Sequence, residues 1–333
     1  MNDPLGWIRT QYFHDRAKIE TVPFGLTNTT GFVSINNQKF VIRKYDSYLK
    51  SIASLSLEIS VTSFLKNRGL TFDIPGFLPT LGEEAYVILP DGALGVCNTY
   101  IEGAAPIIST PRDAEMLGLV VGEMSSRLSE YVRPKELQYG GVPFTDLYGI
   151  HPLIDQEEVE SFWNSPPFPI SVEQKQVYDQ SIASVKENLE EIMSLPRQLV
   201  HHDLLIFNLL ATDQVITGVL DFDFLSVDIA FLEFSISFNH VLQLSGGSLD
   251  MAVAFVEGYS AFRTFTTDEF RQLRLLTRLY HVAVLHIYIG QYLSGKDVSL
   301  AFTHMVNQLI ERDSWLGSNA GKLERMFASS LEQ

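Results

Sequence analysis

The chain has 333 residues, 46% of them hydrophobic, which is enough for a sizeable core and is typical of a globular protein with two lobes or domains. Lys and Arg number 24 against 40 Asp and Glu, so the formal net charge is -16 at pH 7. The chain has no basic run of the kind that follows a phosphate backbone, and this charge balance excludes nucleic acid as an expected partner.

Cys97 is the only cysteine, which excludes an intrachain disulfide and a paired-cysteine metal site. The first residues, MNDPLGWIRT, lack the apolar core of a signal peptide, and no apolar run reaches the length of a membrane span. We therefore expect a cytoplasmic protein that does not bind membranes. The sequence leaves the oligomeric state open.

Residues 25–89 have the pattern of strands and turns around one helix. The stretch VPFGLTNTTGFVSINNQKFVIRKY predicts a β-hairpin that turns at Asn36 and Asn37. The helix that follows has one apolar face, formed by Leu57, Val61, Phe64 and Leu65.

Helical patterns dominate beyond Gly103. Thr110, followed by proline, is typical of a helix start, and an apolar stripe follows it. Capping-box patterns begin at Ser171 and at Thr266. The second precedes a long helix that we expect to reach about Leu293.

The stretch HHDLLIFNLLATDQVITGVLDFDFLSVD, from residue 201 to 228, carries acidic side chains among apolar ones. Its short apolar runs, separated by turn residues, predict small strands and a hairpin that turns at residues 211–214. Two crossings of a short sheet would bring Asp203, Asn208 and Asp221 to one end of it. Carboxylate and amide oxygens at that end suit Mg²⁺, with phosphate oxygens completing its shell.

His201-x-Asp203-x-x-x-x-Asn208, followed by Asp221-Phe222-Asp223, resembles the catalytic loop and the metal-binding aspartate of kinase-like phosphotransferases. This family includes aminoglycoside phosphotransferases, choline kinases and homoserine kinases. The segment GVLDFDFLSVDIAFLEFSISFNH is most similar to bacterial homoserine kinases of this group, and the order of elements matches over roughly residues 18–293.

The resemblance implies an α+β, protein-kinase-like fold with two lobes. An N-terminal antiparallel-sheet lobe would bind the nucleotide with residues 1–97, and residues 98–103 would form a hinge. Residues 104–333 would form a larger, mostly helical lobe with the catalytic loop and the acceptor site.

The resemblance also implies ATP and Mg²⁺ as cofactors and transfer of the γ-phosphate to a hydroxyl group of a small molecule. Asp203 would be the catalytic base, and Asn208 and Asp221 would hold Mg²⁺. The alternative for Asp203 and Asp221 is that they cap turns through backbone hydrogen bonds. Asp223 would bind a second ion or lie in solvent.

In the first lobe, Gly25, Thr27 and Asn28 belong to a loop that resembles the phosphate-covering loop of the family, although a plain turn would look the same. At the hinge, the resemblance assigns Asn98 and Tyr100 to the nucleotide. Whether ATP or GTP is preferred stays open.

Arg43 and Lys44 stand where a kinase places its phosphate-pairing lysine. Alternation along a strand sends them to opposite faces, so only one can reach the phosphates, and the alignment favours Arg43. Glu58, on the following helix, is the expected partner of that cation, with a solvated surface glutamate as the alternative.

Several residues depart from the family pattern. His202 stands in the glycine place of H-G-D, residues 204–207 form a bulky loop that we expect to narrow the acceptor site, and Glu233 lies one place away from the family's second aspartate. These departures leave open a catalytically silent binding or structural protein of the same fold. A zinc hydrolase built on His201, His202, Asp203 and Asp221 is disfavoured, because adjacent histidines on a strand point apart.

The acceptor is less well defined. In this fold it would lie between the catalytic loop and the later helices. The similarity to homoserine kinases favours a small amino alcohol such as homoserine or a choline-like compound, and an aminoglycoside stays open as a further option. Four residues are candidate contacts, with buried core groups as the favoured interpretation: Tyr280, His281, His286 and Tyr288.

Overall fold

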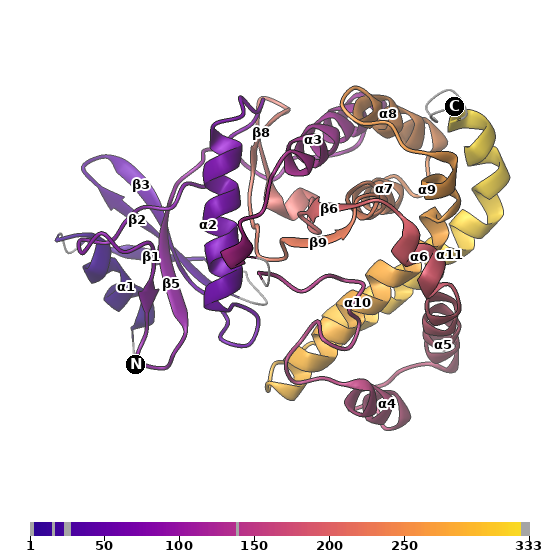
Figure 1. The fold of residues 1–333 in the computed structure, drawn as a ribbon, viewed down its shortest axis with the longest axis horizontal. Helices are drawn as coiled ribbons and strands as arrows, with labels where there is room; N and C mark the ends of the chain where they lie inside the picture. Colours follow the sequence, from indigo (N-terminus) through magenta and orange to yellow (C-terminus); the bar gives the residue numbers. More distant parts are fainter. Residues whose placement is uncertain (1–2, 15–16, 23–27, 138–139, 328–333) are drawn as a thin grey trace.

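The computed structural model describes residues 3–14, 17–22, 28–137 and 140–327, which form two lobes (Figure 1). The smaller, N-terminal lobe contains an antiparallel sheet, and the larger lobe is mostly helical. Figure 1 shows helix α2 (Ile52–Lys66) between the sheet and the larger lobe. The predicted α+β arrangement, a sheet lobe followed by a helical lobe, is confirmed.

The described part of the smaller lobe forms a five-stranded sheet in the order β1-β2-β3-β5-β4. Its strands are β1 (Ile19–Thr21), β2 (Thr29–Ile35), β3 (Gln38–Lys44), β4 (Val87–Ile88) and β5 (Leu94–Thr99). β2 and β3 form the predicted hairpin, and both turn residues have positive φ, 51° at Asn36 and 64° at Asn37. Asparagine tolerates this conformation, which two-residue hairpin turns require.

The two faces of this sheet are covered differently. Helix α1 (Pro4–Tyr12), which the sequence did not predict, packs on one face against Val33, Ile42 and Cys97. On the other face, Tyr45 and Val96 pack against Leu55 of α2. β5 runs to Thr99 and so includes the first residues of the predicted hinge, 98–103, whose boundaries remain a prediction.

The larger lobe is built from helices between residues 111 and 327. They are α3 (Pro111–Ser129), η1 (Lys135–Leu137, a 3-10 turn), α4 (Gln156–Asn164), α5 (Val172–Glu187), α6 (Leu189–Ser194), α7 (Leu232–Leu244), α8 (Leu249–Ser260), α9 (Thr267–Arg271), α10 (Leu273–Leu293) and α11 (Ser299–Phe327). The predicted caps at Thr110, Ser171 and Thr266 are present. The predicted single helix from Thr266 to Leu293 was wrong in one respect: it is interrupted at Gln272.

Four short strands interrupt the helices: β6 (Arg197–Val200), β7 (Leu209–Thr212), β8 (Val215–Val219) and β9 (Ser226–Ile229). β7 and β8 form the predicted hairpin, with positive φ at Asp213 (50°) and Gln214 (65°). The expected single short sheet is instead two, because β6 pairs with β9, a strand that the sequence did not predict.

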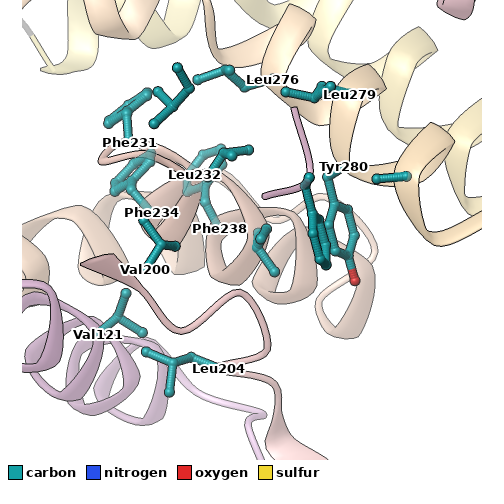
Figure 2. Close-up of a cluster of buried hydrophobic side chains, with 14 of the residues drawn as sticks. Val121, Val200, Leu204, Phe231, Leu232, Phe234, Phe238, Leu276, Leu279 and Tyr280 are labelled. Atoms are coloured by element: carbon teal, nitrogen blue, oxygen red, sulfur yellow. The ribbon is translucent and has the colours of Figure 1, made fainter. Parts of the chain in front are cut away.

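The core of the larger lobe surrounds the segment that enters the candidate site. Figure 2 shows Val200 between Val121 of α3 and Phe234 of α7, with Leu204 near Val121 on the side away from the α7 aromatic side chains. Both Val200 and Leu204 are fully buried, so apolar packing on both sides holds the residues between them in place.

Helices α3 and α8 approach each other closely enough for their backbones to touch. A Cβ atom added to Gly118 would lie 2.1 Å from the carbonyl oxygen of Phe255, and one added to Gly258 would lie 2.0 Å from that of Glu115. Glycine is therefore required at this crossing. Among the described helices, none combines the length and the hydropathy that a membrane crossing requires.

Candidate active site

The loop after β6 brings two predicted site residues together. Asn208 Nδ2 donates hydrogen bonds to Asp203 Oδ2 (2.6 Å) and to the Asp203 carbonyl oxygen (3.0 Å). Asn208 ends the 3-10 helix η2 (Ile206–Asn208) and directly precedes β7, so the hairpin fixes its position. Both bonds use the amide nitrogen, and none of the described residues donates a hydrogen bond to the amide oxygen, which remains available to a ligand.

Asp203 is half-buried in the wall of a cavity. Burial raises the pKa of its carboxyl group well above the ordinary value, and the nearby charge of Asp221 raises it further, against the hydrogen bond from Asn208. A carboxylate that is disfavoured in this way takes up a proton more readily. Asp203 is therefore suited to accept the proton of a hydroxyl group, the role predicted for it.

The alternative that Asp203 and Asp221 merely cap turns has no support in the described part of the chain. The hydrogen bonds that their carboxylates accept come from the side chains of Asn208 and Arg43, and not from backbone N–H groups. Asp221 has φ 62°, a conformation that costs a non-glycine residue free energy. Contacts with the surrounding structure therefore keep Asp221 in a backbone conformation that is unfavourable for an aspartate.

His202, in the glycine place of the family pattern, also adopts a left-handed conformation, with φ 68°. This conformation is the one that glycine adopts without cost. The ring of His202 is buried, with Nδ1 3.0 Å from the Phe224 carbonyl oxygen and Nε2 3.2 Å from Asp228 Oδ2. It stacks on Phe144, with 4.5 Å between ring centroids. These contacts offset the strain and connect the loop of residues 201–208 to β9.

Asp228 and Glu233 hold the loop after β6 through hydrogen bonds with His202 and His201. Burial disfavours the ionised form of Asp228, but the hydrogen bond from His202 and others from Ile229 and Thr145 outweigh it and keep the pKa of Asp228 below its ordinary value. Glu233 Oε2 accepts a hydrogen bond from the backbone N–H of His201 at 2.6 Å. Although one place displaced in sequence, Glu233 thus supports the loop backbone. Burial raises the pKa of Glu233 to about 7.

Asp221 and Asp223, after β8, face cations of the smaller lobe. Arg43 Nη1 lies 3.2 Å from Asp221 Oδ1 and 3.7 Å from Asp223 Oδ1. Asn28 Nδ2 donates a hydrogen bond to Asp223 Oδ2 at 2.5 Å. The side chain of Asp223 is only 13% exposed, so the option that it merely lies in solvent was wrong. Asp223 instead joins the two lobes.

The neighbouring cation of β3 points elsewhere. Lys44 Nζ lies 2.6 Å from Asp91 Oδ2, and the Asp91 side chain is exposed. Arg43 and Lys44 thus lie on opposite faces of the strand, as predicted, and Arg43 is the one directed to the acidic cluster.

Glu58 has a different partner from the one expected. It forms an ion pair with Lys50 and accepts a hydrogen bond from Tyr45 Oη at 3.2 Å. Lys50 is buried and also lies 3.1 Å from Asp223 Oδ1. The expectation that Glu58 pairs with Arg43 was wrong, because the Lys50 side chain occupies the space between Glu58 and Asp223. The alternative of a solvated surface glutamate was also wrong, since Glu58 is 4% exposed.

The sequence analysis missed Lys50. The residue directly precedes Ser51, the N-cap of α2. A cation at a helix N-terminus is unfavourable to the helix dipole, so a lysine at this position conflicts with its local structure. That conflict was the available signal that an acidic partner lies nearby.

The acidic cluster contains more carboxylates than cations. Four carboxyl groups lie near two basic side chains. The carboxyl groups belong to Asp203, Asp221, Asp223 and Glu58, and the basic side chains are Arg43 and Lys50. Burial and the charge of Asp223 raise the pKa of Asp221, although Arg43 opposes this. An excess of negative charge beside carboxylate and amide oxygens fits a hard divalent cation such as Mg²⁺.

The donor set also fits Mg²⁺. Asn208 offers an amide oxygen and Asp221 a carboxylate. Mg²⁺ usually binds one or two carboxylates and completes its shell with waters and phosphate oxygens. Asn208 and Asp221 are the residues that would hold it.

The same geometry does not support the zinc hydrolase. His201 Nδ1 accepts a hydrogen bond from the Asp203 N–H at 3.2 Å, and its ring packs against Phe222. The His202 ring lies in a separate environment, against Phe144. The two adjacent histidines therefore point apart, as expected, and do not form one metal site.

The predicted nucleotide residues that the structure describes have separate sets of contacts. Gly25 and Thr27 lie outside the described residues, and Asn28 contacts Asp223 as given above. Asn98 lies within β5 opposite Val41, and its buried Oδ1 has no hydrogen-bond partner in the described part of the chain. The ring of Tyr100 packs edge-on against Phe32, 5.5 Å away. Their roles remain predictions.

A cavity of about 410 Å³ opens beside the acidic cluster. Asp203, Asn208, Asp221 and Asp223 line one end of it, and α7, α10 and α11 supply most of the remaining wall. Of the bulky loop, Leu204 is buried in the core, whereas Leu205 and Phe207 line the cavity. Two of the four loop residues therefore line this space, and the narrowing of the acceptor site remains a prediction.

The four candidate acceptor contacts on α10 divide into two groups. Tyr280, His281 and Tyr288 line the cavity. His286 is a buried core group: its Nε2 lies 2.8 Å from Tyr178 Oη, and its Nδ1 lies 2.7 Å from the Leu147 carbonyl oxygen.

Comparisons with known proteins agree with this geometry. A family model described as "Phosphotransferase enzyme family" matches residues 18–276. A microcompartment-associated aminopropanol kinase is similar in structure, with a TM-score of 0.72 and 16% identity, over 95% of this chain and 97% of that one. An amicoumacin kinase with bound AMP-PNP and Ca²⁺ has a TM-score of 0.66 and 13% identity, over 92% and 91%.

A spectinomycin phosphotransferase with bound ADP and spectinomycin has a TM-score of 0.60 and 15% identity, over 93% of each chain. At these identities the similarities concern the fold. They show that this chain has the kinase-like, two-lobe fold of these phosphotransferases along nearly its whole length.

Proposed function

This chain belongs to the phosphotransferase enzyme family, and from that premise we propose that it transfers the γ-phosphate of ATP to a hydroxyl group of a small molecule. The observation that carries this proposal is the pairing of Asp203 and Asn208 at the end of a 410 Å³ cavity, beside Asp221. A silent protein of the same fold would not need a poised carboxylate facing an open space.

In the proposed reaction, Asp203 accepts the proton of the acceptor hydroxyl while that oxygen attacks the γ-phosphorus and the bond to the β-phosphate oxygen breaks. Its raised pKa suits this role, because the proton moves to a group with increased affinity for it. Asn208 keeps the carboxylate oriented through its 2.6 Å hydrogen bond. Bound Mg²⁺, held by Asn208 and Asp221, would neutralise charge on the phosphate oxygens.

The smaller lobe would hold the nucleotide. Arg43 is the proposed phosphate-binding cation, because its guanidinium lies 3.2 Å from Asp221, the proposed metal ligand, and can form bidentate contacts with phosphate. Gly25, Thr27 and Asn28 would cover the phosphates. Asn98 and Tyr100 would lie near the base.

Lys50 and Glu58 would act indirectly, by holding Asp223 in place between the lobes. We retain the cytoplasm as the proposed location. An amino alcohol, homoserine or a choline-like compound, remains our proposed acceptor class.

Turnover tests the proposal directly. We expect ADP release from ATP and Mg²⁺ when a panel of amino alcohols, hydroxy amino acids and aminoglycosides is supplied. The Asp203→Asn variant should lose about 10²- to 10⁴-fold in kcat, the range for removal of a general base, while nucleotide binding is retained. Full activity in that variant would refute the role of Asp203. Binding of nucleotide with no turnover of any acceptor would favour the silent protein.

A further inference from the structure

Arg312 of α11 lies in the wall of the cavity, where the sequence analysis predicted no contact. The residue is 6% exposed. Its Nη2 donates to Glu311 Oε2 at 3.2 Å, but its Nε and Nη1 are buried and have no hydrogen-bond partner in the part of the chain that the structure describes. The Glu311 side chain is 63% exposed. The guanidinium therefore has one solvated partner and two unsatisfied donors.

This arrangement is costly unless a ligand completes it. Arginine stays charged in proteins, and a buried charge is destabilising unless it is paired and hydrogen-bonded. An ion pair with a solvent-exposed glutamate contributes little, since water screens it. The unpartnered donors of Arg312 suit an anionic group, whose oxygens match the fork of a guanidinium.

Two neighbouring polar groups add acceptors to this part of the wall. Asn239 Nδ2 donates to the Ser235 carbonyl oxygen (2.6 Å) and to Thr277 Oγ1 (2.7 Å), whereas its buried Oδ1 has no partner among the described residues. His281 Nδ1 lies 2.7 Å from the Thr277 carbonyl oxygen, so the proton is assigned to Nδ1 and Nε2 is left as an acceptor. Burial lowers the pKa of His281 to about 4, and Arg312 contributes, so its ring is neutral.

The distribution of charge over the wall points the same way. The acidic residues that line the cavity are Asp203, Asp221 and Asp223, all in the catalytic segment. The lining that α7, α10 and α11 contribute carries no carboxylate. A polycationic acceptor would find no acidic partners there, whereas an anionic group finds Arg312.

We propose that the acceptor is a small hydroxy acid whose carboxylate binds Arg312, with Asn239 Oδ1 receiving an N–H or O–H group of the same molecule. This inference rests on the proposed function and makes it more specific: the hydroxyl end faces Asp203, and the anionic end faces α11.

The test compares alcohols that differ by one carboxylate. The pairs are L-serine with ethanolamine, L-threonine with 1-aminopropan-2-ol, and L-homoserine with 3-aminopropan-1-ol. Each is assayed by ADP release with wild type, with Arg312→Gln and with Arg274→Gln, which removes an exposed arginine of α10 as a control. Thermal melts show whether each variant is folded.

For at least one pair, we expect wild type to favour the carboxylated member at least tenfold in kcat/KM. The Arg312→Gln variant should lose about 10- to 100-fold for that member, mainly through KM, because charged hydrogen bonds are removed. The preference for the carboxylated member should therefore shrink in Arg312→Gln, whereas Arg274→Gln should keep the wild-type kcat/KM on both members. Equal or better turnover of every decarboxylated member by wild type would overturn the anionic assignment and leave the kinase proposal standing.

Calorimetric titration separates the two proposals when no compound turns over. Binding of one of the hydroxy acids to wild type, weakened in Arg312→Gln, would support the anion site without any activity. Absence of binding by all three, together with absence of turnover, would overturn the inference. Absence of nucleotide binding would count against the kinase proposal alone.

Discussion

Lys50 of the smaller lobe and Asp223 of the larger lobe meet in a buried ion pair, with 3.1 Å between Nζ and Oδ1. The same ammonium group pairs with Glu58 and lies 4.9 Å from the centre of the Tyr45 ring. One cation therefore links helix α2 to the acidic segment that follows β8. Charge, as well as apolar packing, sets the relation between the lobes at the candidate site.

Replacing Lys50 tests this link. The Lys50→Met variant leaves buried Glu58 without its cation and removes the nearer of the two cations of Asp223. Loss of one partner of a buried pair costs about 3–5 kcal/mol of unfolding free energy. Urea unfolding measures the change. The matched control is Lys44→Met, whose partner Asp91 is exposed, so its loss should stay below about 1 kcal/mol. Equal effects of the two substitutions would contradict the role of Lys50.

Asp221 should couple nucleotide binding to Mg²⁺. In thermal-shift titrations, a ligand at a hundredfold excess over its Kd stabilises wild type by roughly 2.7 kcal/mol. We expect this stabilisation by ATP to require Mg²⁺ and to vanish in Asp221→Ala. The control is Asp179→Ala, which removes a surface aspartate paired with Lys175. A Mg²⁺-dependent shift that persists in Asp221→Ala would exclude Asp221 as a metal ligand.

His286 should make stability depend on pH. Burial lowers its pKa to about 4, so between that value and about 6.5 the unfolded chain binds the proton and the folded chain does not. The free energy of unfolding therefore decreases as the pH falls below about 6.5. The decrease is about 2 kcal/mol between pH 7 and pH 5.

The variant His286→Gln lacks this titration, and the other buried histidines are common to both proteins. Urea unfolding at pH 7 and pH 5 should show a smaller loss in the variant than in wild type. The same loss in both proteins would show that His286 is not the group responsible.

The crossing of α3 and α8 should not tolerate a side chain. Gly118→Ala brings a methyl group to 2.1 Å from the Phe255 carbonyl oxygen, and we expect a loss of about 3 kcal/mol or more, since backbone must move. Gly321→Ala is the control, because its nearest neighbour would be 3.7 Å away. Alanine there should stabilise the helix by up to about 1 kcal/mol. Similar melting temperatures for the two variants would contradict a tight crossing.

Features decided by neighbouring residues were predictable from the sequence. The turn at Asn36 and Asn37 and the cap at Thr110 depend on local backbone preferences, and both appear where expected. The pairing of β6 with β9 depends on contacts between segments that are distant in sequence, and the helix break at Gln272 matches no turn residue in the sequence. No local pattern records such contacts, and the sequence analysis missed them.

The candidate site divides in the same way. Asp203 and Asn208 lie five residues apart and meet as expected, because one short loop carries both. The partner of Glu58 was predicted wrongly. It is Lys50, which precedes helix α2 and also contacts Asp223, 173 residues further along the chain. Arg312 was missed because a single arginine on an amphipathic helix has the pattern of a surface residue.

The cavity wall has a consequence for how such an enzyme changes its substrate. On α11 the lining residues His304, Gln308 and Arg312 recur every four positions, so one stripe of the helix faces the cavity while other faces pack into the core. The residues proposed for the chemical step lie in a different part of the chain, residues 201–223. Under the proposed function, exchanges along this helical stripe would change which alcohol binds while the residues of the chemical step stay the same.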